Sequence, residues 1–204
     1  MSPGATFERV YLELKRQLLE GRRPLGAPLE PKLLGEELAA SNTPVRDALH
    51  RLVGEGLVEA PNHNGFHVPR STEAGLRDLY AWNGQVLGMA ARSIQPQADE
   101  AEQVGGDPML DVATATSALF LDIGIRTRNV EQARTIASLN DRLASCRLVE
   151  AAVLAETAAE LIGLRAITRS GDRAALASAL ARYHRRRIRA VAPIVGRLML
   201  GATA

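Results

Sequence analysis

The chain has 204 residues, of which 46% are hydrophobic and 24% charged, so its composition excludes a disordered or fibrous protein. No stretch approaches the roughly 18 apolar residues of a membrane-spanning helix, and residues 1–23 lack the apolar centre of a signal peptide. The net charge of +2 conceals an asymmetry, because residues 1–70 are balanced, residues 71–160 carry −6 and residues 161–204 carry +8. The single cysteine, Cys146, suits a reducing compartment, and we predict a cytoplasmic protein without a membrane partner.

Three helices are predicted near the start of the chain, because apolar side chains recur there at helical spacing. The first spans about residues 6–20, and the second spans residues 31–39. The third follows after a short turn, with Thr43 as its N-cap and Pro44 as its first helical residue. Two glycines, Gly54 and Gly56, end it.

Two short segments rich in β-forming residues follow, at 57–59 and 66–68. The connection at 61–65 is rich in turn residues, so we predict a two-stranded hairpin. The order helix, helix, tight turn, helix, hairpin is typical of a winged helix-turn-helix. We expect this domain to occupy residues 1–70.

Residues 71–204 are predicted to form a second domain that is entirely α-helical, since aromatic residues make up only 3% of the chain. A polar segment at 94–108, broken by glycine and proline, interrupts the helical pattern. Ser71 or Thr72 is expected to cap the first helix of this domain. The predicted helices span about residues 73–93, 109–125, 129–146, 148–169 and 172–191, and Pro193 interrupts the final segment.

The residues at the start of the third helix are candidates for DNA contact, because this end of a helix-turn-helix enters the major groove. Arg46 can pair with guanine or phosphate, and Asn42 can read adenine. Ser41 and Thr43 can donate to phosphate oxygens, and His50 lies one turn further along.

Two residues outside this helix are added to the candidate DNA contacts. Lys32, in the second helix, is either a phosphate contact or an ordinary surface lysine. Gly65, at the tip of the expected hairpin, would let the backbone approach DNA closely.

Around these positions the sequence resembles the GntR family of transcriptional regulators. The matching residues are T-P-V-R-D-A-L at 43–49 and the pieces at 55–58 and 64–66. The resemblance implies DNA contact by Arg46, Thr43 and Gly65. The family usually has arginine where this chain has Asn42 and Lys32, so the resemblance does not carry over an operator sequence.

The second half resembles the helical ligand-binding domain of the FadR-like branch, known as FCD, which implies dimerisation and control by an effector. The matching pieces lie at 78–80, 119–120, 129, 139–143, 171–172 and 183–184. Many such domains hold a metal through one aspartate and three histidines. Those positions fall here on Ser117, Leu121, a residue near Leu161, and His184. One imidazole cannot make such a site, so we predict no metal and no cofactor, and His184 is the candidate effector residue.

Some features allow more than one interpretation. His63 and His67, with His50 nearby, can be metal ligands or exposed wing residues. The basic run at 185–189 can be a solvated helix end, a partner for the acidic middle segment, or a site for an anion. The bundle can hold an apolar effector or none.

The sequence therefore predicts a bacterial regulator that binds a palindromic operator as a homodimer, which we expect to repress transcription under the control of a small-molecule effector. No catalytic triad, phosphate-binding loop or dinucleotide fingerprint occurs, so we expect no enzyme. The alternative is a protein-interaction module whose winged domain no longer reads DNA, which the net zero charge of residues 1–70 favours.

Overall fold

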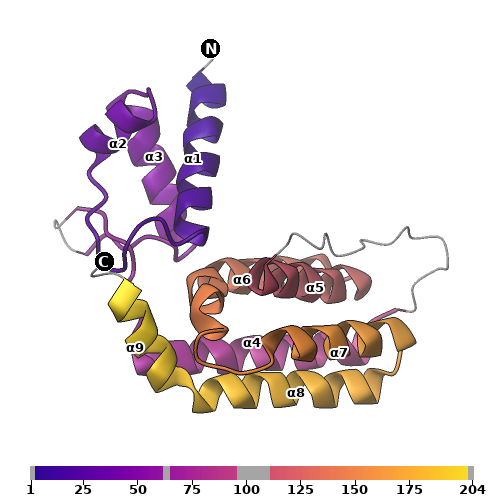
Figure 1. The fold of residues 1–204 in the computed structure, drawn as a ribbon. Coiled ribbons are helices and arrows are strands. Elements are labelled where there is room, and N and C mark those ends of the chain that lie inside the picture. The colour runs from indigo at the N-terminus through magenta and orange to yellow at the C-terminus, as the bar shows by residue number, and fades with distance from the viewer. Residues whose placement is uncertain (1–2, 62–64, 96–110, 202–204) are drawn as a thin grey trace. The chain divides into compact units, whose positions relative to one another are not determined.

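The structure, a computed structural model, describes residues 3–61, 65–95 and 111–201. Over these residues the chain forms nine helices, drawn in Figure 1, so the prediction of a mainly α-helical protein is confirmed. Two compact units are present, one made of residues 1–71 with the chain from Leu198 on, the other spanning Thr72–Arg197. None of the described helices is long and apolar enough to cross a membrane.

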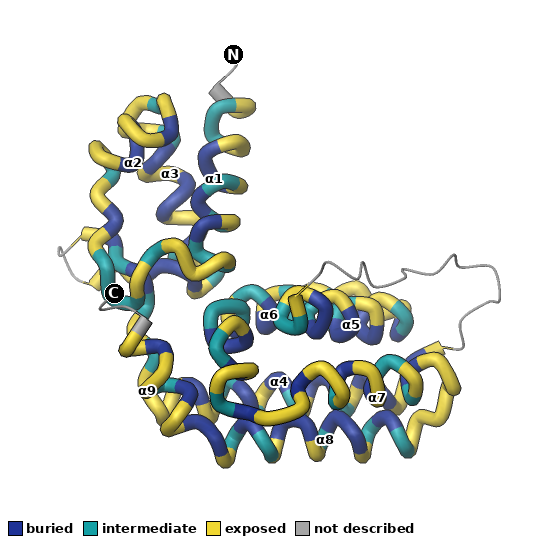
Figure 2. Tube along the Cα trace, in the orientation of Figure 1, coloured by how far each residue is buried: buried dark blue, intermediate teal, exposed yellow. Residues whose placement is uncertain are grey.

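The first unit consists of α1 (Pro3–Leu19), α2 (Pro31–Glu37) and α3 (Asn42–Gly54). Both α1 and α2 pack on α3, and Figure 2 shows the buried residues on the sides where these helices meet. The core contains the apolar residues of the predicted helical pattern: Val10, Tyr11, Leu14, Leu34, Leu38, Val45, Ala48, Leu49 and Leu52. The three helices of the prediction are therefore present.

The start of α3 differs from the prediction that Thr43 caps the helix and Pro44 begins it. The N-cap is Ser41, and Asn42 is the first helical residue, so Pro44 lies in third place. Proline is tolerated there because backbone N–H groups in the first turn have no intrahelical acceptor. The sequence was thus compatible with a helix that starts at Asn42 or at Pro44, and the structure has the earlier start.

The predicted two-stranded wing is wrong as a sheet, because the described residues contain isolated β-bridges but no strand. Glu59 pairs with His67 through two hydrogen bonds of 2.8 Å, and on its other side His67 bridges to Pro28. A longer ladder is blocked because the N–H of Leu57 donates to the carbonyl of Leu52 at the end of α3, and Pro28 has no N–H. The loop tip at 62–64 lies outside the described residues.

The second unit is all-helical. It contains α4 (Glu73–Ser93), α5 (Val112–Arg126), α6 (Val130–Glu150), α7 (Thr157–Ser170), α8 (Arg173–Arg189) and the start of α9 (Val191–Gly201). Side chains of Thr72, Asp111, Asn129 and Asp172 cap four of these helices. The range predicted for α4 is confirmed.

Two helix ends in this unit were predicted wrongly. The break expected after residue 146 lies instead at 151–156, because α6 continues to Glu150 and the turn is closed by Glu156 in a left-handed conformation at φ 55°. Near the end, α9 begins at Val191, and Pro193 lies in its first turn rather than interrupting it. Neither break contains a glycine or a proline, so the sequence has no local signal for these two helix ends.

A buried ion pair joins the helices of this unit. Arg187, 2% exposed, donates from Nε to Glu150 at 2.8 Å and from Nη1 to Glu160 at 2.7 Å. Tyr80 donates its hydroxyl to the other oxygen of Glu150 at 2.6 Å, and the guanidinium of Arg187 stacks on Tyr183 at 3.3 Å. The basic run at 185–189 is therefore partly an internal partner of the acidic segment rather than a fully solvated helix end.

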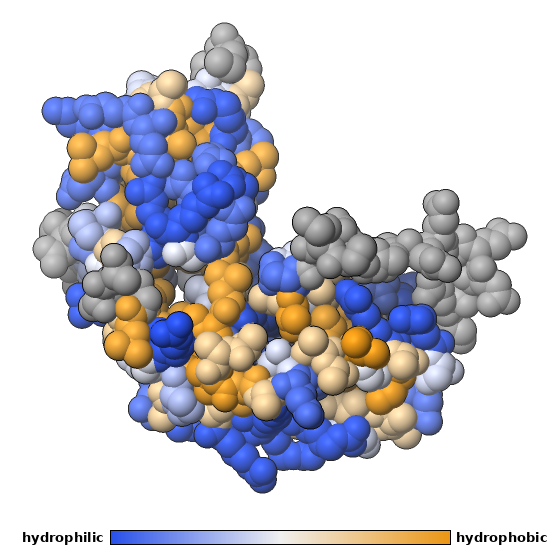
Figure 3. All heavy atoms as spheres, viewed as in Figure 1, coloured by the Kyte–Doolittle hydropathy of each residue, from blue (hydrophilic) through white to orange (hydrophobic). Residues whose placement is uncertain are grey.

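The rest of the basic run differs in exposure. Arg186 is half-buried, donates to the carbonyl of Ala155 and lies 3.5 Å from Glu160. Arg185 and Arg189 are exposed. Figure 3 shows hydrophilic side chains along this outer side of α8.

We expect Arg187→Met to lower the free energy of unfolding by about 3–5 kcal/mol, because it leaves the buried carboxylate of Glu150 without its cation. Urea unfolding monitored by Trp82 fluorescence measures this in the second unit. The matched control is Arg185→Met, on the exposed side of the same helix, with an expected change within about 0.5 kcal/mol. Equal effects of the two variants would show that the pair does not stabilise the fold.

Candidate nucleic-acid interface

One side of α3 carries the predicted DNA contacts. Its buried side consists of Val45, Ala48, Leu49 and Leu52, which fix the helix against α1 and α2. The predicted contacts are all exposed: Ser41, Asn42, Thr43, Arg46 and His50. The helix thus presents polar side chains over its first two turns while its other side is anchored in the core.

The N-terminus of α3 keeps hydrogen-bonding capacity for a ligand. Ser41, the N-cap, makes no side-chain hydrogen bond to the helix, although serine at this position normally accepts from a first-turn N–H. The N–H groups of a first helical turn have no acceptor within the helix, and the helix dipole favours an anion at this end. Such an end suits a phosphate group.

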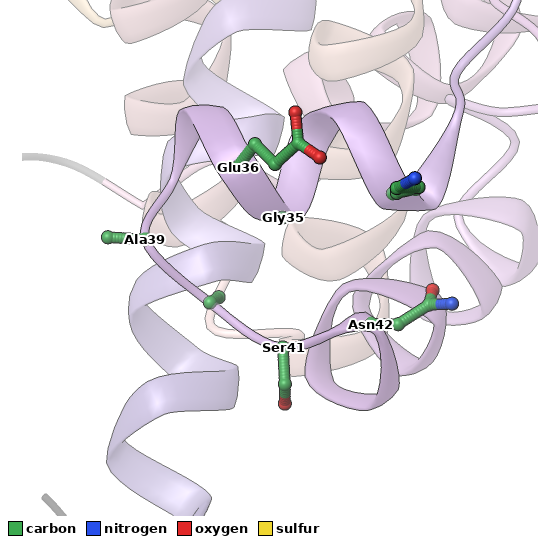
Figure 4. Close-up of a pocket in the computed structure, with 7 residues that line it drawn as sticks. Gly35, Glu36, Ala39, Ser41 and Asn42 are labelled. Atoms are coloured by element: carbon green, nitrogen blue, oxygen red, sulfur yellow. The ribbon is translucent and has the colours of Figure 1, made fainter.

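A hollow of about 480 Å³ lies between α2 and the first turn of α3. It brings together three predicted contacts, Lys32, Ser41 and Asn42, from two helices. Figure 4 shows the connection from Ala39 to Ser41 running from α2 to the start of α3, with Asn42 beyond it. Glu36 also lines the hollow and places an acidic side chain beside Lys32.

The shape of this hollow depends on a tight turn between the two helices. A Cβ on Gly35 would lie 2.7 Å from the carbonyl oxygen of Ala40, so only glycine allows the chain to pass so close to α2. Ala39 adopts φ 47°, a left-handed conformation that is strained for alanine. Arg9 from α1 stabilises the turn by donating to the carbonyl of Leu38 at 2.8 Å. Sequence reasoning missed Arg9 because its acceptor lies 29 residues away.

Phe66, at the start of the return segment, links the wing to α3. Its ring lies 4.9 Å from the ring of His50, edge-on, and 6.0 Å from the guanidinium carbon of Arg46. These contacts restrict both candidate side chains. The predicted contact Gly65 is exposed and has φ 76°, a conformation that favours glycine.

The histidines do not form a metal centre in the part of the chain that the structure describes. His67 is half-buried between the bridges to Pro28 and Glu59, and His50 lies against Phe66. His63 lies outside the described residues. Within residues 3–61, 65–95 and 111–201, no three histidine, cysteine or acidic side chains gather in a way that could hold an ion.

In the second unit, the positions that the FCD resemblance assigns to metal ligands do not fit a metal. Leu121 and Leu161 have apolar side chains, and Leu161 is buried. The Nδ1 of His184 lies 2.7 Å from the carbonyl oxygen of Leu180, and its Nε2 is buried without a hydrogen-bond partner. Burial lowers the pKa of His184 to about 4, opposed by the bond to Leu180, so the ring is neutral at pH 7.

Residues 6–68 match the family model of bacterial regulatory proteins, gntR family. This segment is therefore similar to the DNA-binding part of that family. A protein of Paenarthrobacter nicotinovorans, named as a probable transcriptional repressor of a D-xylose utilization operon, is 34% identical over 76 residues, which cover 37% of this chain and 34% of that protein. The HTH-type transcriptional regulator YdhC of Bacillus subtilis is 25% identical over 100 residues, 49% of this chain and 45% of YdhC. The chain therefore spans less than half the length of these curated relatives.

Solved structures resemble the fold over nearly the whole chain. E. coli McbR/YncC has a TM-score of 0.64 at 22% identity, covering 92% of this chain and 97% of that one. A protein of Rhodococcus sp. RHA1 described as a transcriptional regulator, GntR, has a TM-score of 0.61 at 19% identity, covering 94% and 98%. At these identities the likeness establishes the fold alone, so the GntR assignment rests on residues 6–68.

His184 gives a prediction for stability against pH. Its pKa falls from 6.5 to about 4 on folding, so the unfolded chain binds one more proton between these values. The free energy of unfolding should be highest above pH 6.5 and fall by about 3 kcal/mol as the pH drops to 4. Denaturant unfolding at several pH values should show this slope, and His184→Leu should flatten it between pH 6.5 and 4.5. The exposed His50→Gln is the control, and an unchanged slope in His184→Leu would contradict the assignment.

Proposed function

We propose that the chain is a sequence-specific DNA-binding transcriptional regulator that acts as a homodimer on a palindromic operator in the cytoplasm. In this proposal, residues 1–70 bind DNA, and residues 71–204 form an FCD-like domain for dimerisation and effector control. The observation that carries the proposal is the exposed, polar N-terminal side of α3 within a GntR-family domain. The Paenarthrobacter relative, which is similar to this chain over 76 residues, is named as a probable transcriptional repressor. This name supports repression rather than activation.

The contacts divide into base-reading and phosphate-binding groups. Arg46 would pair with guanine through its planar guanidinium, and Asn42 would read adenine. Ser41 and Lys32 would hold a phosphate at the hollow between α2 and α3, which both residues line. Thr43 would hold a phosphate at the first turn of α3.

The charge of the DNA-binding part favours two copies over one. Residues 1–70 carry no net charge, so few phosphates can be neutralised by a single copy. Joining two copies makes the second contact intramolecular and raises its effective concentration. The two recognition helices would then read half-sites about one DNA turn apart.

A stripe on α4 is suited to pairing with a second copy of the chain. The buried side of α4 packs on α8, α6 and α5, and its other side exposes Trp82 and Met89, 47% and 45% accessible. Exposed Asp78, Gln85 and Arg92 continue the same stripe, with alternating spacings of four and three residues. This spacing is typical of a helix-pairing seam.

Two copies of this stripe are complementary to each other when the two α4 helices run antiparallel. If two copies of α4 cross about a two-fold axis at Gln85, Asp78 of one copy faces Arg92 of the other, because both are equally far from Gln85 in sequence. Trp82 would then lie over Gly88 of the second copy, where a Cβ meets no atom within 4 Å in the chain itself. An isologous contact of this kind gives a closed dimer.

Arg46→Ala tests the DNA-binding role. We expect affinity for the DNA upstream of the protein's own gene to fall about 10- to 100-fold, since one bidentate base contact is worth about 1–3 kcal/mol. Gel shifts against a scrambled fragment of equal length measure this. Arg51→Gln is the matched control, because Arg51 lies on the same helix but pairs with Glu8 of α1. If wild type shows no preference for the native fragment, or Arg46→Ala binds it equally well, the proposal of a sequence-specific regulator fails and the alternative of a protein-interaction module is kept.

The dimer is tested by charge exchange on α4. Sedimentation equilibrium at micromolar concentration should give twice 21.9 kDa for wild type. The mass of the Asp78→Arg variant should shift toward that of the monomer, because like charges then lie opposite each other. The double variant Asp78→Arg with Arg92→Asp should restore the dimer. Ile162→Asp, an exposed apolar residue of α7, is the control. A monomeric wild type, or a dimer indifferent to Asp78→Arg, would exclude this surface.

A further inference from the structure

The outer side of α8 carries three exposed arginines, Arg182, Arg185 and Arg189, which we call the arginine row. A helix turns by about 100° per residue, so these three side chains fall within about 60° of its circumference. Within the part of the chain that the structure describes, none of them makes a hydrogen bond or an ion pair. Figure 3 shows hydrophilic side chains along this side of the helix.

The other two arginines of the run at 185–189 lie on a different side of α8. Arg187 is buried and pairs with Glu150 and Glu160. Arg186 is half-buried and lies 3.5 Å from Glu160. The run is continuous in sequence, but the helical period divides it into an internal and an external part. The internal pairing therefore leaves the arginine row without an explanation.

The other long helices of the second unit pair their exposed charges within the same helix. These pairs are Glu73 with Arg77, Asp122 with Arg126, and Glu131 with Arg134. Residues 173–204, by contrast, contain no aspartate or glutamate, so α8 cannot pair the arginine row in this way. The carboxylates already paired on α4, α5 and α6 are also not free to bind the row of a second copy of the chain.

The dipole of α8 does not account for the arginine row either. Basic side chains are favoured in the last turn of a helix, where Arg186, Arg187 and Arg189 lie. This effect falls off within that turn, and Arg182 and Arg185 lie before it. Like charges three and four residues apart repel each other and destabilise a helix. The row therefore lowers the stability of the free chain, and a bound polyanion would remove this repulsion.

The spacing of the arginine row matches the charge density of duplex DNA. Arg182 and Arg189 are seven residues apart, about 10.5 Å along the helix axis, so the row carries one positive charge for about each 3.5 Å. Each strand of duplex DNA carries one phosphate for about every 3.4 Å of its axis. A guanidinium can bond two phosphate oxygens at once and keeps its charge at neutral pH. The row therefore fits a regular polymer of phosphates better than a single anion.

The surface of α8 does not suit the other common polyanion, a lipid membrane. A helix that lies in a membrane interface buries an apolar side among the lipids. The large apolar residues of α8, Leu176, Leu180 and Tyr183, are buried in the second unit. None of the exposed large hydrophobic side chains among the described residues belongs to α8. Nucleic acid is thus favoured over anionic lipid.

We propose that the arginine row of α8 binds the phosphate backbone of double-stranded DNA, independently of base sequence, as a second DNA contact in addition to the start of α3. This contact lies outside residues 6–68, which match the family model. Residues 1–70 carry no net charge, and the row supplies phosphate contacts that this part lacks. The contact requires neither an operator nor base reading by Arg46, so it does not rest on the proposed function.

The salt dependence of binding to a labelled duplex of scrambled sequence tests the proposal. The full chain is compared by fluorescence anisotropy with a triple variant that carries Arg182→Gln, Arg185→Gln and Arg189→Gln. Loss of three phosphate contacts should reduce the slope of log affinity against log salt by about 2.7 for each bound chain. Between about 50 and 200 mM salt, wild type should therefore lose about 40-fold more affinity than the variant. The unfolding midpoint should stay unchanged, because all three side chains are exposed.

Two further variants separate a local contact from a general effect of charge. The matched control carries Arg134→Gln, Arg142→Gln and Arg169→Gln, three exposed positions on α6 and α7. It loses the same charge and should keep the slope of wild type. Replacing all three arginines of the row by lysine keeps the positive charge and should also keep the slope, because counterion release depends on the number of neutralised phosphates.

The native upstream fragment distinguishes this contact from base reading. The glutamine variant of the row should weaken binding to the native and the scrambled duplex by the same factor, because phosphate contacts are independent of sequence. Arg46→Ala should instead lower the ratio between the two affinities.

The proposal is overturned if the glutamine variant keeps the slope of wild type or if the matched control reduces it equally. It is also overturned if the variant loses binding to phosphatidylglycerol vesicles but not to the duplex. An unchanged slope together with a lost native preference in Arg46→Ala would reject the arginine row alone. A reduced slope in a chain that shows no native preference would keep the row and reject the sequence-specific regulator.

Discussion

The fold of the second unit depends on supplying hydrogen-bond and charge partners to Arg187, whose guanidinium group lies almost completely out of water. Moving such a charge into the interior costs several kcal/mol, so it is stable only with partners at close range. Glu150, Glu160, the carbonyl of Tyr183 and the ring of Tyr183 supply them. Because Tyr80 donates to Glu150, the arrangement connects α4, α6, α7 and α8 at one point, and a shift of any of these helices breaks a charged contact.

The need to pair Arg187 determines which acceptors remain for the other buried polar groups of the second unit. Glu150 and Glu160 are committed to α8, and Arg147, one turn before Glu150 on α6, is left with two neutral acceptors, Ser117 and Asn140. Around Phe120 the rings of Tyr183 and His184 gather with the guanidinium of Arg147. The bundle therefore combines an apolar shell with a polar centre, where burial raises the pKa of Tyr183 to about 12 and lowers that of His184 to about 4.

The sequence was informative where the determinants are local. Apolar periodicity and a capping residue at 71 or 72 predicted α4 within its observed range, and the motif around Arg46 predicted an exposed helix start. It was misleading where the determinants are distant in the chain. The return segment of the wing bonds both to residues 26–29 and to Glu59, which no short-range turn signal reveals. Arg187 and Glu150 are 37 residues apart, so the sequence could not decide whether the run of arginines is a solvated helix end or pairs with the acidic segment.

The two units differ in how they treat polar groups that the fold leaves without partners. The first unit keeps them at its surface, at the N-cap Ser41 and along the exposed side of α3, where water satisfies them in the free protein. The second unit also has them in its interior, at the Nε and Nη2 atoms of Arg147, where water cannot do so cheaply. A buried donor without an acceptor costs free energy that an exposed donor does not, so the polar centre lowers the stability of the second unit, whereas the exposed polar groups of α3 do not lower that of the first.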